Sequence, residues 1–260
     1  MAALLAVLVL WAGGPPPPKA PIPRDPAALA ARLGSTTRDL AAAIDRWQAR
    51  TGRVPDDVTL YSLYQQRILI LLSERRSLAK AVFARVRAPA LESEVSARRE
   101  LGRLSKPRPL RAFRTGPAAP AARLRGYYLE AQSRFGVAWN VLAAVNYVES
   151  AFNKLRNASS AGAQGPMQFI PATWRRYGLG GNVHDPHDAI LGAANYLHAN
   201  GAPRNYRRAL YRYNPSSLYV DAVSRYASRI RSDPRVYYVF YSRQVFVRTP
   251  HGLVRLTGPR

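Results

Sequence analysis

The 260-residue chain contains no cysteine. This absence excludes disulfide bonds, cysteine nucleophiles and thiolate metal sites. It leaves the cellular compartment open, because many exported bacterial proteins have no disulfide. The four histidines form no HExxH pattern, which is the usual signature of a helical zinc site. We therefore expect no bound metal and no cofactor.

Acidic residues are scarce, with 15 Asp and Glu against 39 Lys and Arg and a net charge of +24. Such a balance indicates anionic partners or surroundings, such as nucleic acid, an anionic membrane or acidic cell-wall polymers. The basic residues are scattered along the chain, and we find no helix-turn-helix or RNA-binding aromatic signature. The sequence therefore argues against nucleic acid as the partner.

Long apolar runs are also missing. The stretch from Ala2 to Ala12 is apolar, but a helix that crosses a bilayer needs about 20 residues. Its length suits the apolar region of an export signal, although no Lys or Arg precedes it. We predict an export signal and Pro-rich linker in residues 1–26, with no stable membrane span after signal removal. The alternatives are an N-terminal membrane tether and a frayed apolar tail.

Apolar residues from Ala27 to Ser105 recur at helical spacing. The run Ile68–Leu72 is flanked closely by charged residues, which predicts a buried helix segment. We interpret 27–105 as an accessory helical region of unknown role, made of one helix before residue 50, an apolar stretch over 58–86 and a third helix over 91–104. The Pro- and Arg-rich segment 106–120 is predicted to be a linker.

The helical pattern resumes over 121–232. Helices are expected over residues 121–135, 137–150, 171–177, 186–200, 204–213 and 216–230. Gly136 has the chemistry of a helix end, and Asp185 and Ser216 stand where helix caps are expected. Residues 233–260 are rich in Val, Tyr and Phe with a Pro-His-Gly turn, which predicts a C-terminal β-hairpin from Val236 onward. The fold class is therefore mainly α.

Glu149 is the one acid in the stretch from Asn146 to Gly178. Its segment, VAWNVLAAVNYVES, is apolar nearly all round, which predicts a buried helix. Burial would raise the pKa of a carboxyl, and a carboxyl that is protonated near neutral pH can serve as a general acid. The alternative is that Glu149 turns outward or pairs with Arg156.

A loop of small residues follows, from Ser159 to Pro166, and then Met167-Gln168-Phe169-Ile170 places an amide between apolar side chains. Small residues allow a bulky ligand to approach the backbone. Amides, hydroxyls and aromatic faces together are typical of a sugar-binding groove. A Gly-rich turn packed for structural reasons would have the same composition.

Four motifs now stand in order: "ES", "GAQGPMQFIPATW", "DPHDAILGAANYL" and "ALYRYN". Over residues 125–230 the chain resembles the lytic transglycosylase domain, the soluble-lytic-transglycosylase branch of the lysozyme-like superfamily. The resemblance implies a lysozyme-like helical lobe that cleaves the β-1,4 bond between N-acetylmuramic acid and N-acetylglucosamine in peptidoglycan. One departure is visible, because Pro215 follows the Tyr-Asn pair where related domains often carry a small residue.

By this resemblance Glu149 is the catalytic acid and base. The implied substrate-binding residues are Ser160, Met167, Gln168, Phe169, Tyr196, Tyr213 and Asn214. The partners would be peptidoglycan glycan strands, with anionic wall polymers as a further candidate. We also expect Arg156 to point away from Glu149, and Tyr213 to be the polar side chain closest to it.

A lone carboxylate suits this chemistry, because ordinary glycosidases use two and a transglycosylase draws its nucleophile from the substrate. The sequence leaves two alternatives open: a muramidase of the same fold, and a non-catalytic wall-binding or assembly module.

Overall fold

The computed structural model describes residues 14–47, 53–159 and 161–259. The apolar stretch of the expected export signal and the predicted groove residue Ser160 lie outside the described residues. Within the described ranges the fold is mainly helical and ends in a two-stranded antiparallel hairpin, as predicted. No described helix has the length and apolar character needed to cross a membrane.

The N-terminal region forms the helices α1 (Pro26–Arg46), α2 (Asp56–Glu74), α3 (Arg76–Val86) and α4 (Pro89–Leu104). Asp25 caps α1 by accepting a hydrogen bond from the backbone N–H of Ala28 at 2.8 Å. The apolar run predicted to be a helix segment lies in α2, where Ile68, Leu69 and Leu72 are fully buried. The stretch from 58 to 86 is two helices rather than one, because the chain breaks at Arg75.

The central region contains α5 (Ala121–Phe135), α6 (Trp139–Ser150), α7 (Pro171–Tyr177), α8 (Pro186–Ala199), α9 (Tyr206–Tyr213) and α10 (Ser217–Ser232). The predicted boundary signals act as expected. Gly136 ends α5 at φ 69°, a left-handed conformation that suits glycine. Asp185 caps α8 and Ser216 caps α10 through their side chains. A short 3-10 helix, η2 (Leu110–Ala112), lies in the segment that joins the two regions.

The C-terminal segment corrects one prediction. The hairpin exists, with β1 (Phe246–Thr249) paired to β2 (Gly252–Arg255) and Val247 opposite Val254. Residues predicted to begin the first strand instead form a helix, α11 (Arg235–Ser242). Strand propensity depends on context, and here Tyr237, Phe240 and Tyr241 are buried at helical spacing against aromatic side chains of the central region.

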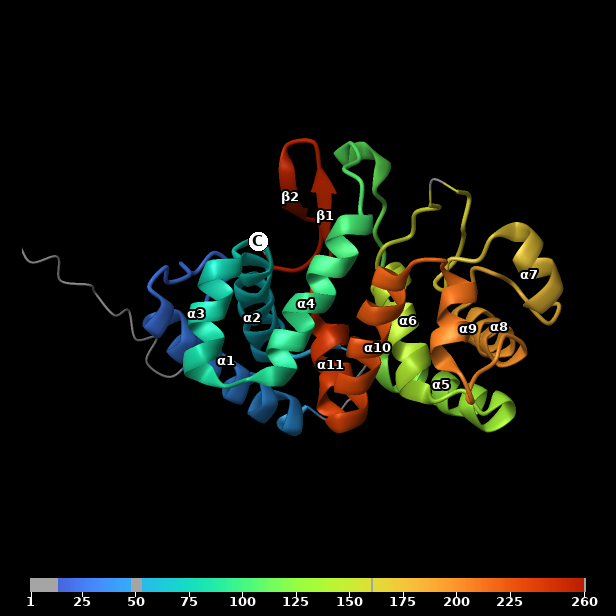
Figure 1. The fold of residues 1–260 in the computed structure, drawn as a ribbon, viewed down its shortest axis with the longest axis horizontal. Helices are drawn as coiled ribbons and strands as arrows, with labels where there is room; N and C mark the ends of the chain where they lie inside the picture. The colour runs from blue at the N-terminus through green and yellow to red at the C-terminus, as the bar shows by residue number, and fades with distance from the viewer. Residues whose placement is uncertain (1–13, 48–52, 160, 260) are drawn as a thin grey trace, which may run out of the picture.

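The helices are arranged along one long axis (Figure 1). α1, α2 and α3 lie at one end, α7, α8 and α9 at the other, and α4, α10 and α11 lie between them. α4 packs along α10, and α11 contacts α1 and α2. One apolar core accordingly includes Leu40 of α1 and Ala97 of α4 together with the buried residues of α5, α6 and α8. The N-terminal helices and the central region are thus joined through a shared core.

A buried ionic cluster crosses this junction. Glu94 of α4 is fully buried and forms ion pairs with Arg229 of α10 and with Arg243, which follows α11. Arg243 is 1% exposed and lies over the ring of Phe240 at 4.8 Å. Removing one partner of a buried ion pair leaves the other charge uncompensated, so this cluster fixes how α4 meets α10 and α11.

Candidate functional site

Glu149 lies in the last turn of α6, just before an unusual backbone segment. Ala151, Phe152 and Asn153 all adopt left-handed conformations, with φ of 51°, 63° and 66°. For residues other than glycine each such conformation costs roughly 1–2 kcal/mol. The segment is held by the fully buried ring of Phe152 and by a 2.8 Å hydrogen bond from the Asn153 N–H to Ser150 Oγ. Backbone strain of this kind concentrates at functional sites.

Among the residues that the structure describes, one side chain forms a hydrogen bond with the carboxyl group of Glu149. The hydroxyl of Tyr219, in the first turn of α10, donates to Glu149 Oε1 at 2.6 Å. Burial raises the pKa of Glu149 to about 7, while the hydrogen bond from Tyr219 acts in the opposite direction. Near neutral pH the carboxyl is therefore divided between its protonated and ionised forms, as a group that must both donate and accept a proton requires.

The predicted partner of Glu149 needs correction. Tyr219, not Tyr213, bonds to the carboxyl, and sequence reasoning missed it. The sequence feature that indicates its burial is the helical spacing of Tyr219, Val223 and Tyr226, which lie on the buried face of α10. Arg156 points away, as expected: its guanidinium donates to the backbone carbonyl of Pro117 at 2.7 Å.

Polar side chains of α6 anchor the loop that follows it. Asn146 Nδ2 and Ser150 Oγ both donate to the carbonyl of Pro166, at 2.8 and 2.6 Å. Asn146 Oδ1 accepts from the hydroxyl of Tyr128 at 2.6 Å. Because these groups are buried and satisfied within the chain, they fix the Gly-rich loop to the helix that carries Glu149.

Gly165 is needed at its place in that loop. Its φ is 74°, and a Cβ atom there would lie 1.9 Å from the carbonyl oxygen of Val183. Only glycine fits a left-handed position this close to another backbone segment.

Four of the predicted groove residues, Met167, Phe169, Tyr196 and Tyr213, contact one another, and Tyr213 lies near Glu149. The hydroxyl of Tyr213 donates to the carbonyl of Met167 at 2.6 Å. Burial raises the pKa of Tyr213 well above its ordinary value, and the nearby Glu149 adds to the effect. The rings of Phe169 and Tyr213 lie 5.8 Å apart, and those of Tyr196 and Tyr213 lie 5.4 Å apart. Met167 and Phe169 are buried, so they form the apolar side of this cluster.

Gln168 and Asn214 lie at the edges of this cluster. Gln168 has a φ of 52°, and its Nε2 donates to the carbonyls of Asn157 and Gly165 at 3.1 and 3.0 Å. In this conformation its amide closes the loop. Asn214 ends α9 and is half-buried.

A cleft of about 600 Å³ opens at Glu149. One wall is the end of α6, including Tyr147, Val148 and Glu149, with Tyr226 of α10. The other walls come from the C-terminal half of α2, from α4 and from the hairpin. The accessory helices therefore line the cleft that reaches Glu149.

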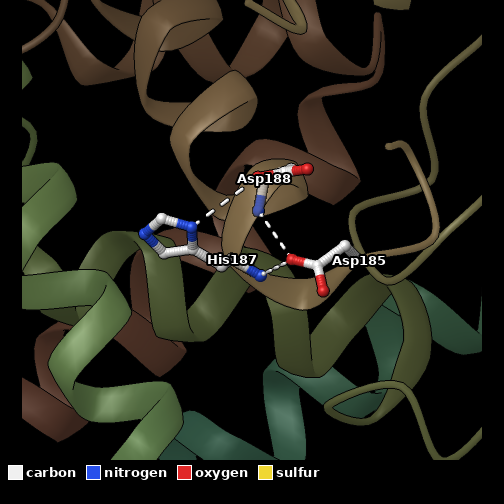
Figure 2. Close-up of side chains that lie close together, drawn as sticks. All are labelled: Asp185, His187 and Asp188. Carbon is white, nitrogen blue, oxygen red and sulfur yellow. Dashed lines mark hydrogen bonds and ion pairs between the residues drawn. The ribbon is translucent and has the colours of Figure 1, made fainter. Parts of the chain in front are cut away.

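The described residues contain one group with the spacing of a metal site, Asp185, His187 and Asp188 (Figure 2). Its atoms already have partners. Asp185 Oδ1 accepts from the backbone N–H groups of His187 and Asp188 at 2.8 and 3.1 Å, which caps α8. His187 Nε2 lies 2.9 Å from a carboxylate oxygen of Glu130. These interactions identify the group as the start of α8.

Comparison with known proteins agrees with this geometry. Residues 126–229 match the model of the transglycosylase SLT domain. The chain is 38% identical over 74 residues to membrane-bound lytic murein transglycosylase F of Thiobacillus denitrificans, covering 28% of this chain and 15% of that protein. It is 29% identical over 160 residues to membrane-bound lytic murein transglycosylase F 1 of Alkalilimnicola ehrlichii, covering 56% of this chain and 32% of that protein.

The chain thus spans a third or less of the length of these relatives. No solved structure matches it significantly. The matched segment begins in α5 and ends in α10, and it contains Glu149, the Gly-rich loop and Tyr219. The chain thus contains a transglycosylase SLT domain, formed by residues 126–229.

Proposed function

We propose that the protein is a peptidoglycan lytic transglycosylase, which cleaves the β-1,4 bond between N-acetylmuramic acid and N-acetylglucosamine and leaves 1,6-anhydromuramoyl ends. The observation that carries the proposal is the state of Glu149. Its pKa is raised to about 7 by burial, and it lies in a cleft within a domain of the transglycosylase SLT family.

Protonated Glu149 begins the reaction as the general acid. It donates its proton to the glycosidic oxygen of the leaving N-acetylglucosamine, and the bond from muramoyl C1 to that oxygen breaks. The substrate's own N-acetyl group supports the developing positive charge at C1. The resulting carboxylate of Glu149 then accepts the proton of the muramoyl 6-hydroxyl, whose oxygen attacks C1. No water is consumed, and Glu149 ends the cycle protonated.

The lone carboxylate favours this route over two-carboxylate hydrolysis. A retaining glycosidase needs a second carboxylate about 5–5.5 Å from the first, and an inverting one about 6.5–9.5 Å away. No other carboxylate contributes to the raised pKa of Glu149. Glu74 also lines the cleft, but it is exposed at the end of α2. The site therefore suits a reaction in which the substrate supplies the nucleophile.

Tyr219 would position the acid. Its hydroxyl donates to Glu149 Oε1, which leaves Oε2 to carry the transferred proton. The same hydrogen bond stabilises the carboxylate that forms after the first step, because charge-assisted hydrogen bonds are stronger than neutral ones.

The predicted groove residues Met167, Gln168, Phe169, Tyr196, Tyr213 and Asn214, together with Ser160, would bind the glycan strand beside Glu149. The net charge of +24 would hold the enzyme at the anionic cell wall. We place its action outside the cytoplasm; the two relatives are named as membrane-bound proteins, which is compatible with a tether at the N-terminal apolar segment.

The test is digestion of purified sacculi followed by mass spectrometry of the products. The wild-type protein should release anhydromuropeptides. Glu149→Gln should release them at least about 10²-fold more slowly, which is the usual size of a general-acid contribution. Glu130→Gln makes the same chemical change at an exposed residue of α5 and serves as the matched control.

Two other results would replace the proposal. Reducing ends, which are heavier than anhydro ends by one water, would identify a muramidase. Binding to sacculi without release of any fragment would identify a wall-binding module.

A further inference from the structure

The walls of the cleft opposite α6 are rich in arginine. The lining includes Arg76 of α3, Arg98, Arg99 and Arg103 of α4, and Arg248 of β1. Its acids are Glu74 and Glu149. Within the described part of the chain none of these arginines forms an ion pair. The cleft lining therefore carries more positive than negative charge, although Glu92 and Glu100 of α4 lie near Arg99 and Arg103.

One of these arginines, Arg99, is held in place by the end of α2. Arg99 donates to the carbonyls of Leu72 and Ser73 at the end of α2, at 2.8 and 3.1 Å. Burial lowers the pKa of Arg99 and the nearby Arg76 lowers it further, while Glu92 acts in the opposite direction. Arg98 has a buried Nε that finds no hydrogen-bond partner among the described residues.

Bringing like charges together in a cleft is unfavourable unless an anion occupies it, because cations repel one another more strongly where water is partly excluded. Guanidinium groups match carboxylates well, since both are planar and can form two parallel hydrogen bonds. An uncharged sugar gives no comparable reason for this lining. The ligand that suits these walls is a molecule with several carboxylates.

The proposed reaction brings such a molecule to the site. The sugar cleaved at C1 is N-acetylmuramic acid, which carries the stem peptide, so the peptide begins within one sugar ring of the scissile bond. An extended chain covers about 3.3–3.6 Å per residue, and three residues therefore reach roughly 10 Å from their attachment point. The free carboxylates of the stem peptide would fall within the cleft that opens at Glu149.

We propose that the arginine-lined walls formed by α3, α4 and β1 bind the carboxylates of the stem peptide carried by the muramoyl residue at Glu149. This inference rests on the proposed function. It assigns the accessory helices and the hairpin a role in substrate selection: the enzyme prefers glycan strands that still carry peptides.

The experiment compares two substrates and three proteins. The substrates are peptidoglycan freed of teichoic acids, and the same strands after an amidase has removed the peptides. The proteins are the wild type, the cleft variant Arg76→Gln/Arg103→Gln/Arg248→Gln, and the control variant Arg175→Gln/Arg204→Gln/Arg231→Gln. All six substituted arginines are exposed, and both variants lose the same charge.

The expected measurement is the ratio of kcat/KM on peptide-bearing strands to kcat/KM on peptide-free strands. The wild type and the control should favour peptide-bearing strands. In the cleft variant the ratio of the two kcat/KM values should be about tenfold lower, which corresponds to about 1.4 kcal/mol. The preference should also weaken as salt increases, because exposed charges are screened.

The outcomes separate this inference from the proposed function. If the wild type cleaves both substrates with equal kcat/KM, or if the cleft variant loses no more preference than the control, the inference is wrong while the transglycosylase activity stands. A cleft variant that slows equally on both substrates would also overturn it. If the wild type releases anhydro products from neither substrate, the proposed function itself fails.

Discussion

Replacing Glu149 by glutamine should make the protein inactive and, above neutral pH, more stable. The raised pKa of Glu149 means that the folded protein holds its proton more tightly than the unfolded chain does. The shift runs from 4.5 to about 7 and comes mainly from burial. At about 1.4 kcal/mol per pKa unit, ionising this group in the folded state costs about 3 kcal/mol.

The pH window follows from these two pKa values. Below pH 4.5 the carboxyl is protonated in both states and has no effect on the free energy of unfolding. Between pH 4.5 and 7 the folded state binds more protons than the unfolded state, so the stability of the wild type falls as pH rises. Above pH 7 the group is ionised in both states, and the loss remains constant at about 3 kcal/mol.

Glutamine removes this loss, because it has no charge to desolvate and its Oε1 can still accept the hydrogen bond from Tyr219. The assay is urea unfolding of the wild type and of Glu149→Gln at pH 4.5 and pH 8. The difference between the two proteins should grow by about 3 kcal/mol in favour of Glu149→Gln, and contributions from all other titrating groups cancel in that difference. A difference that stays constant with pH, or a variant that is less stable at pH 8, would refute the raised pKa of Glu149.

Three further predictions test neighbouring features. Tyr219→Phe removes the hydrogen bond that lowers the pKa of Glu149, so the alkaline limb of the pH–rate profile should move to higher pH; a move to lower pH would contradict the assignment of Tyr219. Gly165→Ala places a Cβ atom against the carbonyl of Val183 at a positive φ and should lower stability by more than about 1 kcal/mol, as measured by urea unfolding; an unchanged midpoint would show that the loop can relax. Glu94→Gln leaves the buried Arg243 and the half-buried Arg229 without their shared carboxylate and should cost about 3–5 kcal/mol in the free energy of unfolding. A loss below about 1 kcal/mol would mean that water reaches this cluster.

Local sequence patterns were sufficient for most of the helices. The helix over residues 171–177 and the cap residues Asp185 and Ser216 agree with the structure, because periodicity and capping act within a few residues of the chain. The prediction of a raised pKa at Glu149 also followed from its neighbours, since an apolar helix predicts burial. The family was predictable because its motifs are continuous stretches of sequence. The boundaries of the predicted domains remain predictions.

Contacts between distant segments could not be read in the same way. Tyr219 lies 70 residues from Glu149, and its helical spacing predicts that it is buried but does not predict which carboxyl group it contacts. The helix α11 was predicted to be a strand, because its Val, Tyr and Phe residues favour strands until aromatic partners such as Trp139 and Phe152 bury one helical face.

The cleft likewise combines features that local sequence predicts with features that depend on contacts between distant segments. The sequence alone determined that Glu149 stands at the end of a buried helix and that arginines outnumber acids, because both depend on residue identity and short-range order. Only the tertiary structure decided that α4 packs along α10, which brings Arg98 and Arg103 to the cleft at Glu149. The physical reason is that helix packing depends on which faces fit together across the whole chain, and the buried carboxylate of Glu94 is satisfied only when α4, α10 and Arg243 meet.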